Sequence, residues 1–162
     1  HGGLTEPSLA DSEIRELIHI AHEEGFPVMA HTNGSQAVRA AALAGVDSIE
    51  HGNFCDEDAL RALAASDAIW VPTLVTIENL LGDSRFPEQV VKIIWEGQKK
   101  ALHRGYELGA KLALGSDAGA YRVLHGQGVL DEYRAFQEIL SEDFPEWEKR
   151  IRDGDRLIKE RF

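Results

Sequence analysis

The sequence has a single cysteine, Cys55, among its 162 residues, together with five prolines and one methionine. One cysteine excludes a disulfide framework within the chain and is typical of a reducing cytoplasm, which is the localisation that we expect. No window contains the roughly 18 uncharged apolar residues that a membrane span needs, and no basic segment precedes an apolar one as in a secretory signal. These absences argue against disulfide-stabilised, secreted and membrane-spanning classes of protein.

Positive charge is also scarce, since 17 Lys and Arg residues face 28 Asp and Glu residues and give a formal net charge of −11. An acidic surface repels phosphate backbones, and no long Lys/Arg cluster interrupts it. We therefore expect neither nucleic acid nor a membrane as a partner. The hydrophobic share of 43% is ordinary for a globular protein, so residues 1–162 are expected to form one domain.

Short apolar runs alternate with segments of helical periodicity along the chain. Repeated βα units of this kind require a parallel sheet with helices packed on it, so the sequence predicts an α/β fold with four parallel strands. The sheet is either open and doubly wound or part of a (β/α)₈ barrel, because four strands cannot close a barrel. No glycine-rich nucleotide-binding fingerprint follows any strand. The strands are expected at 26–30, 46–50, 68–73 and 111–117, and the helices at 12–24, 36–45, 56–65, 88–108, 127–140 and 145–160.

Three of the four apolar runs end in a residue that can bind metal, namely His31, His51 and Asp117. The carboxyl ends of parallel strands form the face on which ligands bind, so these side chains are expected to converge. Imidazoles and a carboxylate are typical ligands of a catalytic zinc or a related divalent ion. Such an ion would lower the pKa of a water toward about 7, and a carboxylate beside it could take the proton. The alternative reading makes each of them an ordinary hydrogen-bonding residue.

Four segments around these residues resemble, in order and spacing, the metal-dependent amidohydrolase superfamily, and specifically its imidazolonepropionase- and prolidase-like branch. The resemblance covers about residues 12–128 and implies a (β/α)₈ barrel of which this chain forms the second half. It further implies that His31 ends the fifth strand, His51 the sixth and Asp117 the eighth. The four segments are VMAHTNG (28–34), AGVDSIEHG (44–52), VPTL (71–74) and LGSDAG (114–119).

The resemblance also implies a reaction, the hydrolysis of an amide or other non-ester C–N bond with one or two divalent ions, most simply zinc. His31 and His51 would bind the metal. Asp117 would both ligate the metal and carry the proton from the attacking water to the leaving amine. Dipeptides, N-acyl amino acids and cyclic amides are all open as small-molecule substrates.

Further candidates lie in the loops beside these strand ends. His125, Tyr121 and Arg122 belong to the loop after the last strand and are expected to contact substrate, with Arg122 suited to a carboxylate. Thr73, at the end of the third strand, would point to the same face of the sheet and is likewise expected to contact substrate.

Supporting roles are expected of two residues next to the histidines. Asn33 and Glu50 would orient the histidine rings through hydrogen bonds, although Asn33 is equally well explained as part of a turn. Cys55 is expected to be a small buried side chain and no nucleophile. No functional role is assigned to His19, His22 and His103.

The chain also departs from the amidohydrolase pattern. It has neither the His-x-His pair of the first strand nor the lysine of the fourth, and Gly2-Gly3 resembles the loop that follows the fourth strand. It therefore looks like a carboxyl-terminal half-barrel that needs a partner, either the missing amino-terminal half or a second copy of itself. Residues 131–162 match the family less clearly, and residues from about 128 to 162 are expected to form a helical extension.

Two other functions stay open at this point. Because half of the usual metal ligands are missing, the chain could be a catalytically silent half-barrel that serves as a scaffold or a dimerising fragment. Alternatively the same fold could carry out a metal-dependent deamination. The substrate, the identity and number of metal ions, and the oligomeric state do not follow from the sequence.

Overall fold

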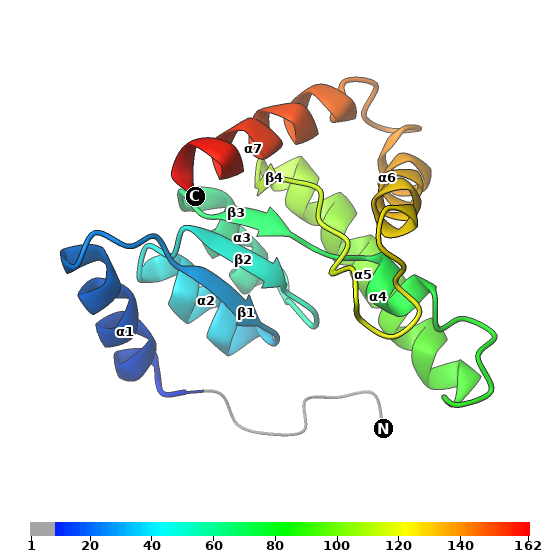
Figure 1. Ribbon diagram of the computed structural model, residues 1–162, viewed down its shortest axis with the longest axis horizontal. Helices are drawn as coiled ribbons and strands as arrows, with labels where there is room; N and C mark the ends of the chain where they lie inside the picture. The colour runs from blue at the N-terminus through cyan, green and yellow to red at the C-terminus, as the bar shows by residue number, and fades with distance from the viewer. Residues whose placement is uncertain (1–8) are drawn as a thin grey trace.

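A four-stranded parallel sheet with the strand order β1-β2-β3-β4 organises the computed structural model, which describes residues 9–162 (Figure 1). The strands are β1 (Met29–Thr32), β2 (Ser48–His51), β3 (Ile69–Val71) and β4 (Lys111–Leu112). Each pairs in parallel with the next, so the expected α/β class is confirmed. The expectation for Gly2-Gly3 lies outside the described residues.

The helices follow the predicted periodicity closely. The segment expected at 56–65 becomes a helix because Asp56 caps it, its side chain accepting a hydrogen bond from Ala59 N at 2.9 Å. The long helix ends at Gly109, whose φ of 95° is the left-handed conformation of a typical helix end. The helices are α1 (Asp11–Glu23), α2 (Ser35–Leu43), α3 (Glu57–Ala65), α4 (Val75–Glu78), α5 (Glu88–Leu108), α6 (Gln127–Leu140) and α7 (Trp147–Arg161).

The structure differs from the sequence prediction in three places. Strand β1 was expected at 26–30 and instead spans Met29–Thr32. The single turn α4 lies in a segment that was expected to be an irregular connection. Strand β4 is shorter than the predicted 111–117, although the chain continues beside β3: Ala113 N donates to Trp70 O at 3.0 Å, and Gly115 packs against Val71. The next amide points to the free edge of β4, where Leu114 N donates to the side chain of Asp155 at 2.9 Å.

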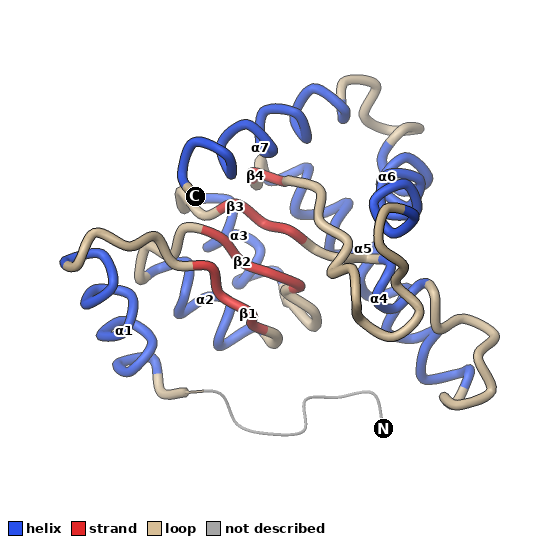
Figure 2. Tube along the Cα trace, viewed as in Figure 1, coloured by secondary structure: helices blue, strands red, loops and turns tan. Residues whose placement is uncertain are grey.

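One face of the sheet carries the main hydrophobic core, beneath α2, α3 and α5 (Figure 2). Trp70 of β3 lies at its centre and is 2% exposed. Helix α5 approaches the indole at Gly105, where an added Cβ would lie 2.7 Å from a ring carbon of Trp70. The absence of a side chain at this position lets the long helix lie directly on the sheet.

Helix α7 covers the opposite face and the free edge of β4. Successive residues of a strand point to opposite faces, so Ile69 and Val71 point away from the main core, where they pack against Leu157 and Ile158 of α7. Gly154 lies against the backbone of β4, which an added Cβ would strike. Covering an edge strand with a helix prevents uncontrolled strand pairing.

The carboxyl-terminal end of α7 is held at the amino ends of the strands. Arg161 Nη1 donates to the carbonyl oxygens of Asp47 and Asp67, both at 3.0 Å, and these residues precede β2 and β3. The two helices of the expected extension thus pack on the body of the domain: α7 contacts β3 and β4, and α6 contacts α4 and α5. Within residues 9–162 no helix has both the length and the apolar character for crossing a bilayer.

The close approach of α7 to β4 gives a prediction. Gly154→Ala places a methyl group against the carbonyl of Leu112, a backbone group that cannot turn away, so we expect the free energy of unfolding to fall by about 1–3 kcal/mol. Gly97→Ala is the matched control, since a Cβ on this glycine of α5 meets nothing within 4 Å and the change should stabilise by about 0.5–1 kcal/mol. Urea unfolding measures both variants. Equal stability of the two would contradict the docking of α7.

Candidate functional site

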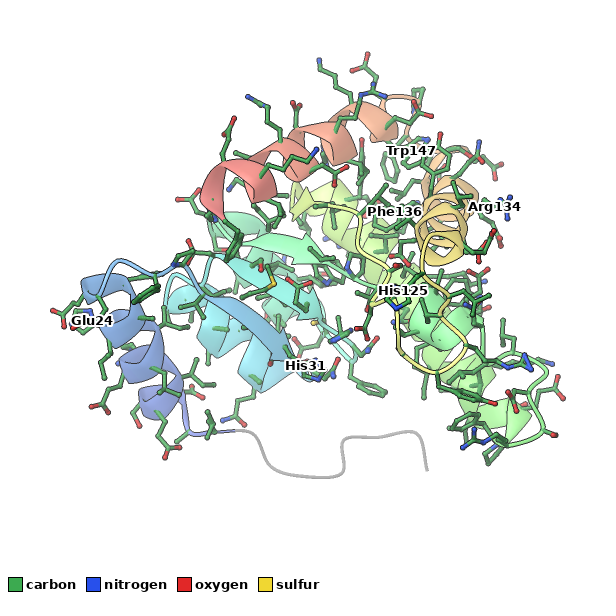
Figure 3. The ribbon with its side chains drawn as sticks, in the orientation of Figure 1. Glu24, His31, His125, Arg134, Phe136 and Trp147 are labelled. Carbon is green, nitrogen blue, oxygen red and sulfur yellow. The ribbon has the colours of Figure 1, made fainter. Side chains whose placement is uncertain are left out.

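Two of the predicted ligands, His31 and His51, meet at the carboxyl ends of neighbouring strands. Strands β1 and β2 pair with Thr32 opposite His51, so the two histidines are diagonal neighbours. His51 Nε2 lies 2.7 Å from His31 Nδ1, and the ring centroids are 4.3 Å apart at an interplanar angle of 73°. Figure 3 shows His31 at the end of its strand.

The backbone of His51 is held in an uncommon conformation. Its φ is 68°, in the left-handed region that non-glycine residues seldom adopt. Trp70 fixes this peptide, because its Nε1 donates to His51 O at 2.9 Å. The next residue, Gly52, also has a positive φ, and a Cβ there would lie 2.7 Å from Trp70 Nε1. The core tryptophan therefore sets the position of the histidine.

Thr73 holds the other side of the His51 ring. Its Oγ1 lies 2.6 Å from His51 Nδ1, and the side chain is only 3% exposed. A hydrogen bond at the second nitrogen of an imidazole fixes its tautomer and orientation, as is usual for metal-binding histidines. The sequence predicted substrate contact for Thr73, and the structure shows it supporting His51.

The two residues predicted to orient the histidines make other hydrogen bonds. Asn33 Oδ1 accepts from Asn53 N at 2.9 Å, and Glu50 Oε1 accepts from Ser48 Oγ at 2.8 Å. The hydrogen bond to His51 that the sequence suggested for them comes from Thr73, 22 residues further along the chain.

Asp117 lies within electrostatic reach of the histidine pair. Burial lowers the pKa of His51, the neighbouring His31 lowers it further, and the charge of Asp117 opposes both. Burial likewise raises the pKa of Glu50; the hydrogen bond from Ser48 opposes this rise and the charge of Asp117 adds to it. A lowered pKa keeps His51 neutral at pH 7, the form in which an imidazole binds a metal ion.

The third ligand position is not assembled. Across residues 9–162, no three His, Cys, Asp or Glu side chains lie close enough together to hold a metal ion. The structure thus brings the two imidazoles together and leaves Asp117 nearby in the loop after β4.

Backbone strain is concentrated in the predicted site. Positive φ at a non-glycine residue costs on the order of 1–3 kcal/mol and persists only where the surrounding structure enforces it. In the part of the chain that the structure describes, five non-glycine residues have positive φ, and four of them are residues that the sequence selected: His51, Thr73, Asp117 and Arg122.

The histidine pair suits a divalent ion. Two nitrogens bound at about 2.1 Å to one tetrahedral ion lie about 3.4 Å apart. The 2.7 Å between His51 Nε2 and His31 Nδ1 is shorter by less than about 1 Å, so a small rotation of the exposed His31 ring would accommodate the ion. The buried His51 ring is already fixed by Thr73.

The residues of the loop after β4 make their contacts with a neighbouring loop. Tyr121 Oη donates to Asp83 Oδ2 at 3.0 Å, and Arg122 Nε pairs with the same oxygen at 2.8 Å. The pKa of Asp83 is lowered by a hydrogen bond from Arg85 N and further by these two side chains. His125 lies in the same loop, near Gly119 (Figure 3).

A hollow of about 340 Å³ opens beside this loop. Its lining includes Arg122 and the apolar Leu124, and Asn79 Nδ2 donates to Arg122 O at 3.0 Å to hold the wall together. The hollow has room for a small side chain or a carboxylate group. The remaining lining residues are Gln127 and Asp131.

Glu132 is a residue that the sequence reasoning missed. It lies on α6 with no exposed surface, and its carboxylate accepts hydrogen bonds from Leu74 N at 2.9 Å and Val75 N at 3.0 Å. Burial raises the pKa of Glu132 to about 8, against these two hydrogen bonds. A glutamate in an amphipathic helix is ordinarily exposed, so the sequence gives no signal for this contact.

All three histidines without an assigned role are paired with acids, His19 with Glu23 on its own helix and the other two with acids far along the chain. His22 Nε2 lies 2.7 Å from Asp47 Oδ2, and His103 Nε2 lies 2.8 Å from Asp143 Oδ2. Asp47 Oδ2 also accepts from Val28 N, so the His22–Asp47 pair helps to fix the start of β1 against that of β2.

Cys55 was expected to be buried, and the structure shows it partly buried. Its Sγ donates to Gly52 O at 3.1 Å, and burial raises the pKa of the thiol to about 12, with the charge of Asp56 adding to the effect. The thiolate is the reactive form of cysteine, so the raised pKa disfavours reaction of this thiol at neutral pH.

Comparison with known proteins shows similarity to longer chains. No protein-family model matches the sequence. An uncharacterized protein of Mycobacterium tuberculosis is 30% identical over an alignment of 148 residues, which covers 85% of this chain and 38% of the relative. The chain thus spans well under half the length of the curated relative.

Among solved structures, the chain is similar to a prolidase complexed with N-methylphosphonate-L-proline, with 29% identity and a TM-score of 0.69 over 85% of this chain and 35% of that one. It is also similar to an Xaa-Pro dipeptidase with methionine bound in the active site, with 25% identity and a TM-score of 0.66 over 87% and 38% of the two chains. These neighbours confirm the resemblance to amidohydrolases and to part of a (β/α)₈ barrel.

The burial of Cys55 predicts slow thiol chemistry. With a pKa of about 12 against about 8.5 for a free thiol, the thiolate fraction at pH 8 falls by more than about a thousandfold. We expect reaction with iodoacetamide at pH 8 to be at least about a hundredfold slower in the folded chain than in the guanidine-unfolded chain. Mass spectrometry after timed quenching gives both rates. Rapid labelling of the folded chain would show that the thiol is accessible and activated.

Proposed function

We propose that this chain is the carboxyl-terminal part of a metal-dependent hydrolase that cleaves amide or other non-ester C–N bonds. The observation that carries the proposal is the His31–His51 pair at the carboxyl ends of β1 and β2, with Asp117 in electrostatic reach. The similarity to a prolidase and to an Xaa-Pro dipeptidase supports the class of reaction.

Each site residue has a part in this proposal. His31 Nδ1 and His51 Nε2 would hold a divalent ion, with zinc favoured by the imidazole and carboxylate donors. Such an ion, when bound, supplies Lewis-acid polarisation of a carbonyl and lowers the pKa of a water. Thr73 keeps the His51 ring directed at this position. Asp117 takes the proton of the attacking water and delivers it to the leaving amine.

The loop after β4 is the proposed substrate-binding wall. Arg122 is held through its Nε by Asp83, which leaves its terminal nitrogens for a substrate carboxylate. Tyr121 and His125 share this loop and would contact the same end of the substrate. A dipeptide or an N-acyl amino acid has both the C–N bond and the free carboxylate that these groups require.

A complementary half-barrel would complete the site. The matched structures extend well beyond this chain, which covers 35–38% of them, and a closed barrel needs eight strands. We propose that an amino-terminal half supplies the remaining ligands and pairs with the edges of this sheet. A second copy of this chain is the alternative partner.

The silent half-barrel is the competing function, and the lack of an assembled three-ligand group within residues 9–162 favours it. Elemental analysis combined with assays on dipeptides and N-acyl amino acids decides between the two. About one or two tightly bound divalent ions per chain with amide hydrolysis support the hydrolase, and a metal-free, inert oligomer supports the scaffold. Release of ammonia without release of an amino acid would indicate a deaminase.

His51→Ala should reduce metal binding. The variant removes the fixed member of the imidazole pair, so we expect zinc affinity to fall at least about tenfold. His19→Ala is the matched control, because His19 lies exposed on α1 and pairs with Glu23. Calorimetric titration with zinc and metal analysis after dialysis measure the effect. Unchanged affinity in His51→Ala would show that His51 is no ligand.

Asp117→Asn should remove proton transfer while the fold is kept. The amide keeps the size of the side chain but cannot accept the proton, so kcat/KM of the active assembly should fall by about 10²–10⁴ while zinc content is largely retained. Asp153→Asn on the exposed side of α7 is the control and should leave the rate unchanged. Equal activity of Asp117→Asn and the wild-type protein would remove the role proposed for Asp117.

A further inference from the structure

Glu132 is connected to the candidate site through hydrogen bonds and a short piece of backbone. Its two carboxylate oxygens accept from the backbone N–H groups of Leu74 and Val75, which lie 58 and 57 residues earlier in the chain. These two residues directly follow Thr73, whose hydroxyl holds His51 Nδ1 at 2.6 Å. His51 in turn faces His31.

Thr73 needs such support because its backbone is strained. Its φ is 48°, and a β-branched residue is a clear outlier in this region. Its carbonyl accepts hydrogen bonds from the backbone and hydroxyl of Thr76, at 3.1 and 2.8 Å. The N–H of the same peptide group, on Leu74, and the next N–H, on Val75, both donate to Glu132. The conformation that presents the threonine hydroxyl to His51 therefore depends on the buried acid.

We propose that Glu132 is a positioning residue for His51, acting through the peptide groups of Leu74 and Val75 and through the hydroxyl of Thr73. The inference rests on the proposed function insofar as it gives His51 a ligand's role.

The choice of an acid at this place supports the inference. Burying a carboxyl group in apolar surroundings is unfavourable, as the rise of its pKa to about 8 reflects, and the nearby Glu78 adds to the rise. Both oxygens of this carboxyl group nonetheless accept from neighbouring N–H groups, whereas an amide has only one acceptor oxygen. A side chain that only filled space between α6 and α4 would need no acceptor at all.

The experiment is a comparison of the ¹⁵N chemical shifts of the His51 ring in the whole chain without metal. Thr73→Val removes the hydroxyl while the side chain keeps nearly the same shape. The shift change in this variant gives the full effect of losing the hydrogen bond between Thr73 and His51. Glu132→Gln loses one of the two acceptors, so we expect it to reproduce at least about half of that shift change. The double variant should differ little from Thr73→Val, because both changes act on the same contact. Thr73→Ser keeps the hydroxyl and should keep the wild-type spectrum.

Asp155→Asn is the matched control. Asp155 also binds a backbone N–H through its carboxylate, that of Leu114 on the far side of the sheet, so the change should lower stability and leave His51 unaffected. Wild-type His51 shifts in a folded but less stable Glu132→Gln would overturn the proposal. If that variant does not fold, Glu132→Asp replaces it, since the shorter side chain reaches at most one amide. A wild-type His51 spectrum in Glu132→Asp would equally overturn it.

Zinc titration keeps this inference distinct from the proposed function. If His51→Ala leaves zinc affinity unchanged, the metal role fails, while the effect of Glu132→Gln on the ring spectrum still supports positioning. If His51→Ala weakens zinc binding and Glu132→Gln alters neither the spectrum nor the affinity, only the role of Glu132 fails.

Discussion

The left-handed backbone at His51 is the constraint on which the candidate site depends. Side chains alternate along a strand, so a regular extension of β2 would send His51 to the same face as Ile49, into the core under the helices. With φ at 68° the ring instead meets His31 at the strand ends. The indole of Trp70 and the hydroxyl of Thr73 hold this conformation from two sides. The geometry of the site therefore depends on the packing of the core around Trp70.

Local patterns predicted most of the fold because the physical causes are local. The long helix 88–108 follows from its apolar periodicity and the glycine after it, and the capping of α3 follows from Asp56. The covering of the free edge of β4 could not be predicted, because it depends on Asp155 binding the Leu114 amide from 41 residues away. The turn α4 is too short for a periodic signal, and its first amides are bound by Glu132 of a distant helix.

The same distinction applies to the site. The meeting of His31 and His51 follows from a general property of parallel sheets, in which the carboxyl ends of adjacent strands share an edge. The partner of a polar side chain in a loop has no such rule. The sequence predicted substrate contacts for Tyr121 and Arg122. In the structure the Tyr121 hydroxyl and Arg122 Nε both contact Asp83. The structure also shows positive φ values at several site residues. The sequence could not predict these backbone angles, because tertiary packing enforces them.

The packing of α7 bears on how a barrel could close around this site. Closure requires both edge strands, β1 and β4, to pair with strands of a partner. The free edge of β4 is covered, with Asp155 bound to the Leu114 amide and Gly154 packed on the backbone. A partner strand that pairs with β4 must displace these contacts. The free energy that α7 gains by packing on β4 therefore weakens the pairing of a partner strand at this edge. The main contacts of α7 with the sheet are to β3 and β4, so pairing at β1 disturbs them less. For the partner proposed above, the edge at β1 is therefore the more accessible of the two for strand pairing.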